Sequence, residues 1–181
     1  MDLGMVGLGR MGANLVRRLR RHGHRTVVYD VNPDAVAESV AEGADGTGSL
    51  DELVESLTTP RVVWVMVPAG LTGEVIQELA SGLSDGDIVI DGGNSFYQDD
   101  IVRAAELAER GIRLVDVGTS GGVFGLDRGF CLMIGGDADA VAHLDPIFRA
   151  LSPGVEAASR TPGAEGQPSA AELAERGIRL V

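Results

Sequence analysis

The sequence predicts a doubly wound α/β domain with a mainly parallel sheet, and three observations support this class. Short apolar runs alternate with segments of helical periodicity, which is typical of repeated βαβ units. One run, VVWVMV at residues 62–67, is apolar at every position, as a parallel strand covered on both faces requires. The first run, residues 3–6, ends in a glycine cluster that opens a helical stretch.

Local signals justify the first elements after that strand. Met11, Leu15 and Leu19 recur at helical spacing, and Gly23 stands where the helix should end. Residues 26–29 are β-branched and aromatic, so we expect a second strand there, and Pro33 opens the next helix.

The same alternation predicts the remaining elements. We expect further strands at residues 61–67, 87–90, 112–117 and 130–134, with a weak last candidate at 155–158. Helices are expected between and after them, at residues 50–57, 72–79, 99–110 and 138–151.

Composition and charge limit the classes of function. The chain has 181 residues, a length typical of one domain, and its 15 basic and 27 acidic side chains give a formal net charge of −12. The electric field of such a negative chain repels phosphate backbones and anionic lipid surfaces. Neither nucleic acid nor a membrane is therefore expected as a partner. The apolar runs are too short to span a bilayer and no signal-peptide pattern begins the chain, so we expect a cytoplasmic protein.

Lysine is absent and cysteine occurs once, which excludes several kinds of mechanism and site. All 15 basic residues are arginines, so any mechanism that needs a lysine within this chain is excluded. The single cysteine, Cys131, permits neither an internal disulfide nor a cysteine-based zinc site, and no metal site is expected. Because Cys131 lies in an apolar strand, we expect it to be a small buried hydrophobic residue rather than a nucleophile.

The end of the sequence departs from the pattern of the rest. Residues 161–169 have the composition of a linker, and residues 170–181 repeat residues 104–115 letter for letter. We therefore divide the chain into a dinucleotide-binding domain at residues 1–160 and a linker with a duplicated segment at residues 161–181. The duplicate is interpreted as an accident of duplication and not as a functional module.

A dinucleotide-binding fingerprint follows the first strand. It reads G-x-G-x-x-G and comprises Gly7, Leu8, Gly9, Arg10, Met11 and Gly12. In such a loop the first glycine allows the tight turn, the second admits a pyrophosphate, and the third lets the helix pack on the strand. Asp30 stands 30 − 12 = 18 positions later, at the end of the second strand, where its carboxylate can bind ribose hydroxyls and repel a 2′-phosphate. These features predict a Rossmann-like domain that binds NAD in preference to NADP.

Three more loops follow strands and belong to the same expected sheet edge. The first contains Val67, Pro68 and Ala69, whose backbone groups are candidates for lining the dinucleotide cleft. The second is DGGNS at residues 91–95, and the third is DVGTSGGVFG at residues 116–125. Their glycines leave room for a ligand, and their amide and hydroxyl side chains offer hydrogen bonds.

These loops carry a resemblance to a known family. GLGRMG, MVPAG, DGGNSFYQDD and DVGTSGGVFGLDRGFCLMIGG together resemble the N-terminal half of decarboxylating 6-phosphogluconate dehydrogenase, most closely its NAD-preferring bacterial branch. The similarity covers roughly residues 1–158. In NADP-dependent relatives the second strand ends in Asn-Arg-Thr, whereas Asp30, Val31 and Asn32 stand here.

The resemblance implies roles for several residues. Asn94 would contact both cofactor and substrate, and Ser120, Gly121 and Gly122 would bind the carboxylate and hydroxyls of a sugar-acid phosphate. The family oxidises 6-phosphogluconate to ribulose 5-phosphate with loss of carbon dioxide, and its general base is a lysine on a following helical domain. The sequence has no lysine and ends before such a domain, so we expect negligible turnover by the chain alone.

Other interpretations stay open. A β-hydroxyacid dehydrogenase such as 3-hydroxyisobutyrate dehydrogenase shares the fingerprint, but such enzymes usually carry a Ser-Thr pair where this chain has Asn94 and Ser95. A non-catalytic NAD-binding module, a homo-oligomer and a subunit that pairs with a separate catalytic chain are further alternatives. Because Arg10 lies inside the fingerprint, its side chain is a candidate for a pyrophosphate contact. His143 and the arginines of residues 17–21 are interpreted as solvated surface groups.

Overall fold

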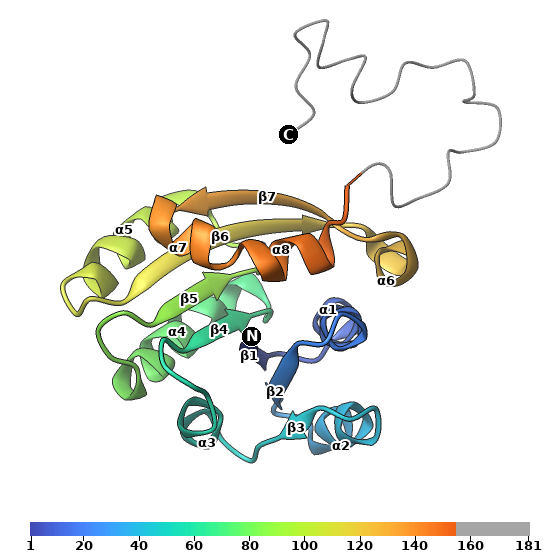
Figure 1. Cartoon of the computed structure of the whole chain (residues 1–181). Helices are drawn as coiled ribbons and strands as arrows, with labels where there is room; N and C mark the ends of the chain where they lie inside the picture. The colour runs from blue at the N-terminus through green and yellow to red at the C-terminus, as the bar shows by residue number, and fades with distance from the viewer. Residues whose placement is uncertain (155–181) are drawn as a thin grey trace, which may run out of the picture.

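Seven strands form one sheet in the order β3-β2-β1-β4-β5-β6-β7 in the computed structural model, which describes residues 1–154 (Figure 1). The strands are β1 (Asp2–Val6), β2 (Arg25–Tyr29), β3 (Asp45–Gly46), β4 (Val62–Val65), β5 (Ile88–Asp91), β6 (Arg113–Ser120) and β7 (Cys131–Gly136). The first six are parallel to their neighbours, and β7 pairs antiparallel with β6. The predicted fold class is therefore confirmed.

Helices cover both faces of this sheet. They are α1 (Arg10–Arg21), α2 (Pro33–Ala41), α3 (Leu50–Glu55), α4 (Ala69–Gly82), α5 (Tyr97–Ala108), α6 (Gly125–Arg128), α7 (Ala138–His143) and α8 (Asp145–Leu151), with a 3-10 turn η1 (Gly122–Phe124). Helices α1, α7 and α8 pack on one face and α3, α4 and α5 on the other. None of the helices within residues 1–154 has both the length and the apolar character that a membrane crossing requires.

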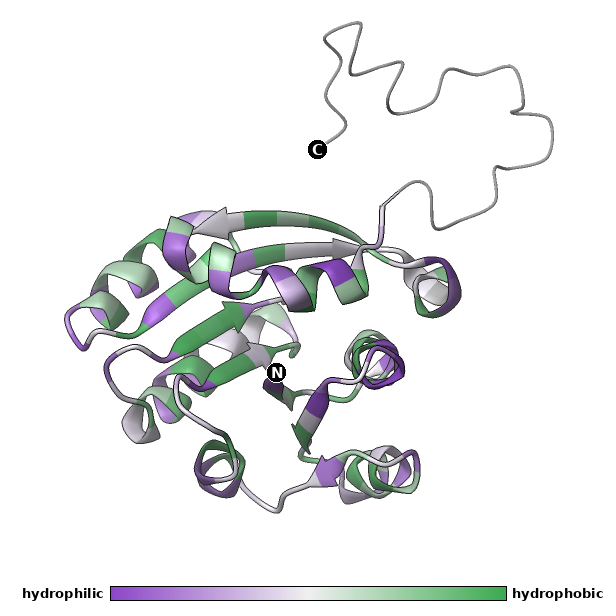
Figure 2. Ribbon diagram, in the orientation of Figure 1, coloured by the Kyte–Doolittle hydropathy of each residue, from purple (hydrophilic) through white to green (hydrophobic). Residues whose placement is uncertain are grey.

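The core consists of two apolar layers, one on each side of the sheet. Alternate residues of β4 divide between them: Trp64 packs with α1 and α8, whereas Val63 and Val65 pack with α3 and α4. Every residue of β4 is buried, which explains why the run at residues 62–67 is apolar throughout (Figure 2). Phe148 of α8 meets the Trp64 ring edge-on, with 6.4 Å between ring centroids.

Some elements differ from the sequence prediction. Strand β6 extends three residues beyond the predicted end, because its polar last residues pair with β7. The predicted helix at residues 138–151 is two helices, separated at Leu144, where Pro146 begins a new first turn. The two-residue strand β3 and the short helix α6 were missed, because neither is long enough to show periodicity.

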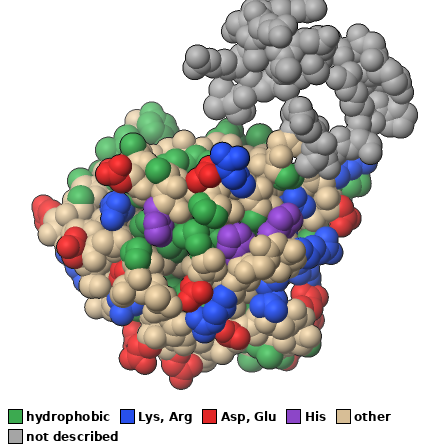
Figure 3. Space-filling view, in the orientation of Figure 1, with side chains coloured by type: hydrophobic (Ala, Val, Ile, Leu, Met, Phe, Trp, Pro, Cys, Tyr) green, Lys and Arg blue, Asp and Glu red, His purple; other side chains and the backbone are tan. Residues whose placement is uncertain are grey.

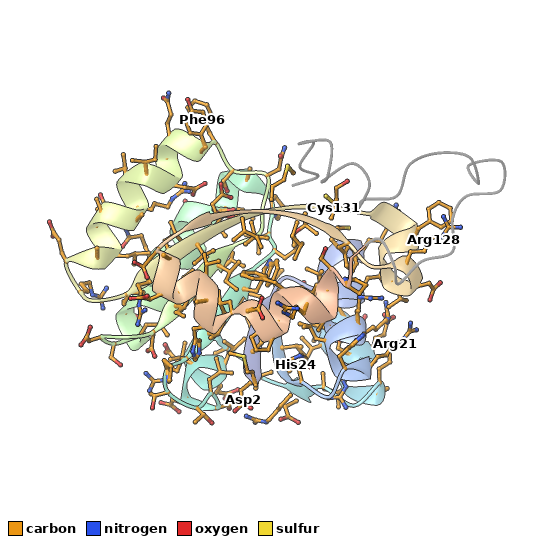
Figure 4. All side chains as sticks on the ribbon, turned by 45° about the horizontal axis from the view of Figure 1, so that its top comes forward. Asp2, Arg21, His24, Phe96, Arg128 and Cys131 are labelled. Atoms are coloured by element: carbon orange, nitrogen blue, oxygen red, sulfur yellow. The ribbon has the colours of Figure 1, made fainter. Side chains whose placement is uncertain are left out.

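The prediction that Cys131 is buried was wrong. The side chain is exposed, because β7 is an edge strand of the sheet and no helix of residues 1–154 covers this part of its outer face (Figure 4). An apolar run therefore did not imply burial on both faces here. Residues 155–181, which contain the weak strand candidate and the duplicated segment, lie outside the described residues.

The sequence suggested that the arginines of α1 are all solvated surface groups, and for one of them this was wrong. Arg18 is buried, and its guanidinium donates to the backbone carbonyls of Ala150 (2.8 Å) and Leu126 (3.1 Å). Desolvation lowers the pKa of Arg18, although the group stays positively charged. Arg18 thus connects α1 to α6 and to the end of α8. His143 is exposed, as predicted.

Acidic and basic side chains are scattered over the face that carries α7 and α8, with apolar groups between them (Figure 3). Among the residues that the structure describes, this side of the molecule shows no continuous basic stripe of the kind that binds a nucleic acid backbone.

Candidate functional site

The carboxyl ends of the parallel strands lie at one edge of the sheet, and the predicted site residues follow those ends. Strand order reverses between β1 and β4, whose chains continue to opposite faces. A crevice outside this point is where open α/β sheets bind ligands. The fold thus places the loops after β1, β2, β4, β5 and β6 at a single edge.

The three fingerprint glycines have different surroundings. Gly7 has a φ of +95°, which a residue with a side chain rarely adopts, and its backbone N–H donates to the carbonyl of Tyr29 (2.9 Å). A Cβ at Gly12 would clash with the carbonyl oxygen of Gly7, so only glycine lets α1 approach β1 this closely. A Cβ at Gly9 would meet open space. Two of the glycines therefore serve the protein's own packing, and Gly9 leaves room for an external group.

Gly9 also begins α1. It is the N-cap residue, and its carbonyl accepts from the N–H of Ala13 (3.0 Å). The N–H groups of the first turn, before Ala13, have no acceptor within the helix, and the helix dipole adds positive potential there. Arg10 is exposed at the start of this turn, and no acidic residue lies in it. The first turn of α1 is therefore suited to an anionic group such as a diphosphate.

Asp30 lies beside the fingerprint loop. Its Oδ2 accepts a hydrogen bond from the backbone N–H of Leu8 (2.6 Å), and its Oδ1 accepts one from the N–H of Asn32 (2.8 Å). Each carboxylate oxygen has a further lone pair for a ligand hydroxyl. Asn32 caps α2 by accepting from the N–H of Asp34 (3.1 Å), and Val31 is exposed between them. Asp30 thus fixes the fingerprint loop in addition to any role in ligand binding, which the sequence had not indicated.

The loop after β4 joins it directly to α4. Val67 is half-buried, Pro68 is the exposed N-cap of the helix, and Ala69 is its first residue. Thr72 is buried in the first turns of α4, at the limit of hydrogen-bond distance from the Pro68 carbonyl (3.5 Å). These backbone groups therefore stand at the sheet edge as predicted, next to Gly7, whose Cβ position faces the Met66 carbonyl.

The loop after β5 is held in place by Trp64 and Asp91. A Cβ on Gly92 would clash with the indole of Trp64, so the backbone lies directly on that buried ring. The N–H of Gly93 donates to Oδ1 of Asp91 (2.9 Å). Asn94 is exposed immediately after this turn. A rigid turn therefore presents the Asn94 side chain at the sheet edge.

The loop after β6 bends sharply into η1. Ser120 is the exposed last residue of the strand, and Gly121 and Gly122 both have positive φ values, +150° and +48°. The Gly121 carbonyl accepts from the N–H groups of Phe124 (3.1 Å) and Gly125 (3.0 Å). This compact turn leaves the Ser120 hydroxyl at the same edge of the sheet.

An acidic cluster beneath the Asn94 loop was missed by sequence reasoning. It consists of Asp91 on β5, Asp100 and Arg103 on α5, and Asp116 on β6. Arg103 Nη1 donates to Asp100 Oδ1 (2.6 Å) and lies 3.7 Å from Asp91 Oδ2. Asp91 is 0% exposed and Asp100 5% exposed, and the Oδ2 atom of each has no hydrogen-bond partner among the described residues. Only the tertiary fold brings these groups together, so no spacing in the sequence predicts the cluster.

Burial in this cluster changes the protonation of two carboxyl groups. Desolvation raises the pKa of Asp100 to about 6, and the Asp91 carboxylate raises it further than Arg103 lowers it. Desolvation also raises the pKa of Asp116, with Asp100 adding to the effect. The cluster thus takes up protons at a pH where exposed aspartates are ionised.

This shift predicts a pH dependence of stability. The folded-state pKa of Asp100 lies above the unfolded value of 3.8, so its contribution to stability is largest below pH 4 and is lost as the pH rises toward 6. The loss is on the order of 2–3 kcal/mol if the shift is fully expressed. Urea unfolding of the parent and of Asp100→Asn at pH 4.5 and 7 measures it, and the difference between the two proteins should change with pH.

The exposed neighbour Asp99 provides the control for this measurement, since it lies in the same first turn of α5. Asp99→Asn should parallel the parent at both pH values. A constant offset between the parent and Asp100→Asn would contradict the assignment of the titration to Asp100.

A metal-dependent chemistry finds no ligand set in the described part of the chain. Within residues 1–154 no group of three or more His, Cys, Asp or Glu side chains could hold a metal ion. The donors that the site does offer are backbone N–H groups, an amide and a hydroxyl, which suit an organic anion.

Comparison with known proteins gives these features a context. A family model described as the NAD binding domain of 6-phosphogluconate dehydrogenase matches residues 2–159. Among its relatives, the NAD(+)-dependent, decarboxylating 6-phosphogluconate dehydrogenase of Haloferax volcanii is 39% identical over 155 residues, which cover 85% of this chain and 51% of the relative. The chain therefore spans about half the length of this relative.

Solved structures of two kinds of dehydrogenase share this fold. The 6-phosphogluconate dehydrogenase of Plasmodium falciparum superposes with a TM-score of 0.80 and 29% identity, over 87% of this chain and 35% of that one. The 3-hydroxyisobutyrate dehydrogenase of Salmonella typhimurium superposes with a TM-score of 0.76 and 28% identity, over 84% of this chain and 54% of that one. In both cases the match covers one part of a longer protein.

Proposed function

Because the chain belongs to the 6-phosphogluconate dehydrogenase family and carries its NAD(P)-binding domain, we propose that it binds NAD in preference to NADP at the carboxyl edge of its sheet. The diphosphate lies on the first turn of α1, and the adenosine ribose is bound by Asp30. Residues 1–160 form this binding unit.

One observation carries the proposal. The Asp30 carboxylate is hydrogen-bonded to the fingerprint loop at Leu8, while Gly9 next to it faces open space. A dinucleotide whose diphosphate binds at Gly9 therefore meets a fixed carboxylate, because Asp30 is hydrogen-bonded to Leu8, the residue before Gly9. That group accepts bonds from two ribose hydroxyls and repels a 2′-phosphate.

Calorimetric titration of the chain with NAD and with NADP tests this proposal. We expect saturable binding of NAD and weaker binding of NADP. The buried Trp64, which underlies Gly92, provides a second signal through its fluorescence. Equal affinity for the two cofactors contradicts the selectivity, and absence of binding to either contradicts the site.

The family relationship supports a substrate as well. We infer that Asn94 contacts both cofactor and substrate and that Ser120, Gly121 and Gly122 bind the carboxylate and hydroxyls of a sugar-acid phosphate. Val31, Asn32, Val67, Pro68 and Ala69 line the cofactor side. These residues hold and orient the two ligands, and the bound dinucleotide supplies the hydride chemistry.

The chain alone should not turn over 6-phosphogluconate at a detectable rate. General-base catalysis by a positioned side chain contributes roughly 10²- to 10⁴-fold, and no lysine is present to supply the base that the family uses. NADH formation measured at 340 nm should equal that of a protein-free blank. A rate proportional to protein concentration would contradict this expectation and would require another base among the residues of the chain.

A second candidate is oxidation of a β-hydroxyacid such as 3-hydroxyisobutyrate. The structural similarity to the Salmonella enzyme supports it. The pair Asn94 and Ser95 argues for the sugar acid, since β-hydroxyacid enzymes usually carry Ser-Thr there. Calorimetry of the NAD-saturated chain with 6-phosphogluconate and with 3-hydroxyisobutyrate separates the two, because each hypothesis expects binding of only one.

A further inference from the structure

The cluster beneath the Asn94 loop holds more negative charge than it neutralises. Asp91 and Asp100 face one guanidinium, that of Arg103, and Asp116 is close enough to Asp100 for the two carboxyl groups to interact. Arg103 itself lies between α5 and α4, where its Nη2 would be 3.2 Å from a Cβ on Gly73. Two buried carboxylate oxygens, Oδ2 of Asp91 and Oδ2 of Asp100, have no hydrogen-bond partner among the described residues. Such a group is costly unless a proton or a cation satisfies it.

Asp91 connects this cluster to the loop that carries Asn94. Its Oδ1 accepts the N–H of Gly93, while Gly92 is fixed against the Trp64 indole. The loop therefore has a rigid support at Gly92 and an electrostatic support at Gly93. A shift of the Asp91 carboxylate would move the next residue, Asn94, because nothing else described on its own side chain holds it.

We propose that Asp100 and Arg103 are positioning residues for Asn94, acting through the Asp91 carboxylate on the turn at Gly92 and Gly93. Both residues lie on α5, outside the loops that we assign to the cofactor. This inference rests on the proposed function only in giving Asn94 a ligand, since the coupling to the loop exists in the free protein.

The protonation of Asp100 sets how firmly Asp91 is held. When Asp100 is protonated, its hydroxyl can donate to Oδ2 of Asp91, which satisfies both unpartnered oxygens and leaves Arg103 to balance the charge of Asp91. When Asp100 is ionised, two adjacent buried carboxylates share one guanidinium and repel each other. The groups that face Asp100 are Asp91 from β5, Arg103 from α5 and Asp116 from β6, and Tyr97 lines the adjoining 250 Å³ pocket with Asp100 and Asp116.

The proposal is tested first without ligand, by following the backbone amide resonances of Gly93 and Asn94 in ¹⁵N-labelled protein from pH 4.5 to 8. In the parent both should shift with a common midpoint near pH 6. Asp100→Asn, which keeps a hydrogen-bond donor toward Asp91 and cannot titrate there, should abolish that transition. Asp99→Asn, the exposed neighbour, should leave it unchanged.

A second measurement connects the cluster to the ligand. The affinity of the parent for NAD should fall about fivefold between pH 5 and pH 8, a coupling of the size common between linked sites. Asp100→Asn should bind NAD with an affinity that is constant over this range. Asp99→Asn should follow the parent.

The outcomes distinguish this proposal from the proposed function. If none of the proteins binds NAD but the Gly93 and Asn94 resonances still titrate in the parent and in Asp99→Asn and not in Asp100→Asn, the cofactor assignment fails and the coupling to the loop stands. If NAD binds with the same pH dependence in the parent and in Asp100→Asn, or if the Gly93 resonance ignores the substitution, the positioning role is overturned. A merely structural role would change the unfolding free energy and leave both pH profiles parallel to that of the parent.

Discussion

Replacing Asp30 with alanine is expected to weaken NAD binding by roughly 10- to 100-fold, because hydrogen bonds to a charged acceptor contribute about 1.5–3 kcal/mol. Affinity for NADP should change less, since the carboxylate that repels its 2′-phosphate is also removed. The ratio of the two affinities therefore moves toward one. Calorimetric titration of parent and variant with both cofactors measures this ratio directly.

The hydrogen bond from the Leu8 N–H to Asp30 complicates the interpretation and calls for two further variants. Asp30→Asn retains an acceptor for one of the two backbone N–H groups but removes the charge, so it should separate support of the loop from repulsion of the phosphate. Asp34→Ala removes an equal charge from the first turn of α2 and should leave both affinities near their parent values. A parent chain that does not discriminate between the cofactors would refute the role given to Asp30.

The second large effect concerns the fingerprint glycines, which the structure assigns to different purposes. Gly12→Ala should destabilise the fold by about 1–3 kcal/mol or more, because its Cβ would overlap a backbone carbonyl that cannot move aside. Gly9→Ala should change the unfolding free energy by about 1 kcal/mol or less, the usual preference for glycine over alanine at an N-cap, since its φ of −59° suits alanine and its Cβ meets no atom. Gly9→Ala should nevertheless reduce NAD affinity more than tenfold, because its methyl group would occupy the position that we propose for the diphosphate.

The two substitutions thus form a matched pair, each the control of the other. Urea unfolding reports the first effect and calorimetry the second. If Gly9→Ala binds NAD as well as the parent, the open space at Gly9 is not where the diphosphate lies. If Gly12→Ala is as stable as the parent, α1 and β1 are not in the close contact that the structure shows.

Sequence reasoning was most successful where a local pattern determines the outcome. The parallel strands and the glycine-rich turn into α1 could be predicted because apolar runs and glycine spacing are contiguous in the chain. The burial of Trp64 follows from the same periodicity. These features fix the sheet edge and therefore the position of the candidate site.

Features that depend on contacts distant in sequence could not be predicted. Arg18 looked like its solvated neighbours, because its acceptors lie at residues 126 and 150. Cys131 looked buried, because the sequence does not show that β7 is an edge strand. The pairing of Asp91 with Asp100 and Arg103 requires α5 to lie on β5 and β6. The spacing of the aspartates in the sequence does not predict this contact.

The antiparallel pairing of β6 with β7 has a practical consequence. Cys131 lies directly opposite Ser120 in the register of these two strands, and it is the one cysteine of the whole sequence. An environment-sensitive dye attached to this exposed thiol would therefore sit beside the loop that we assign to the sugar acid. The natural chain already provides a single-site optical reporter of ligand arrival, and no engineered attachment point is required.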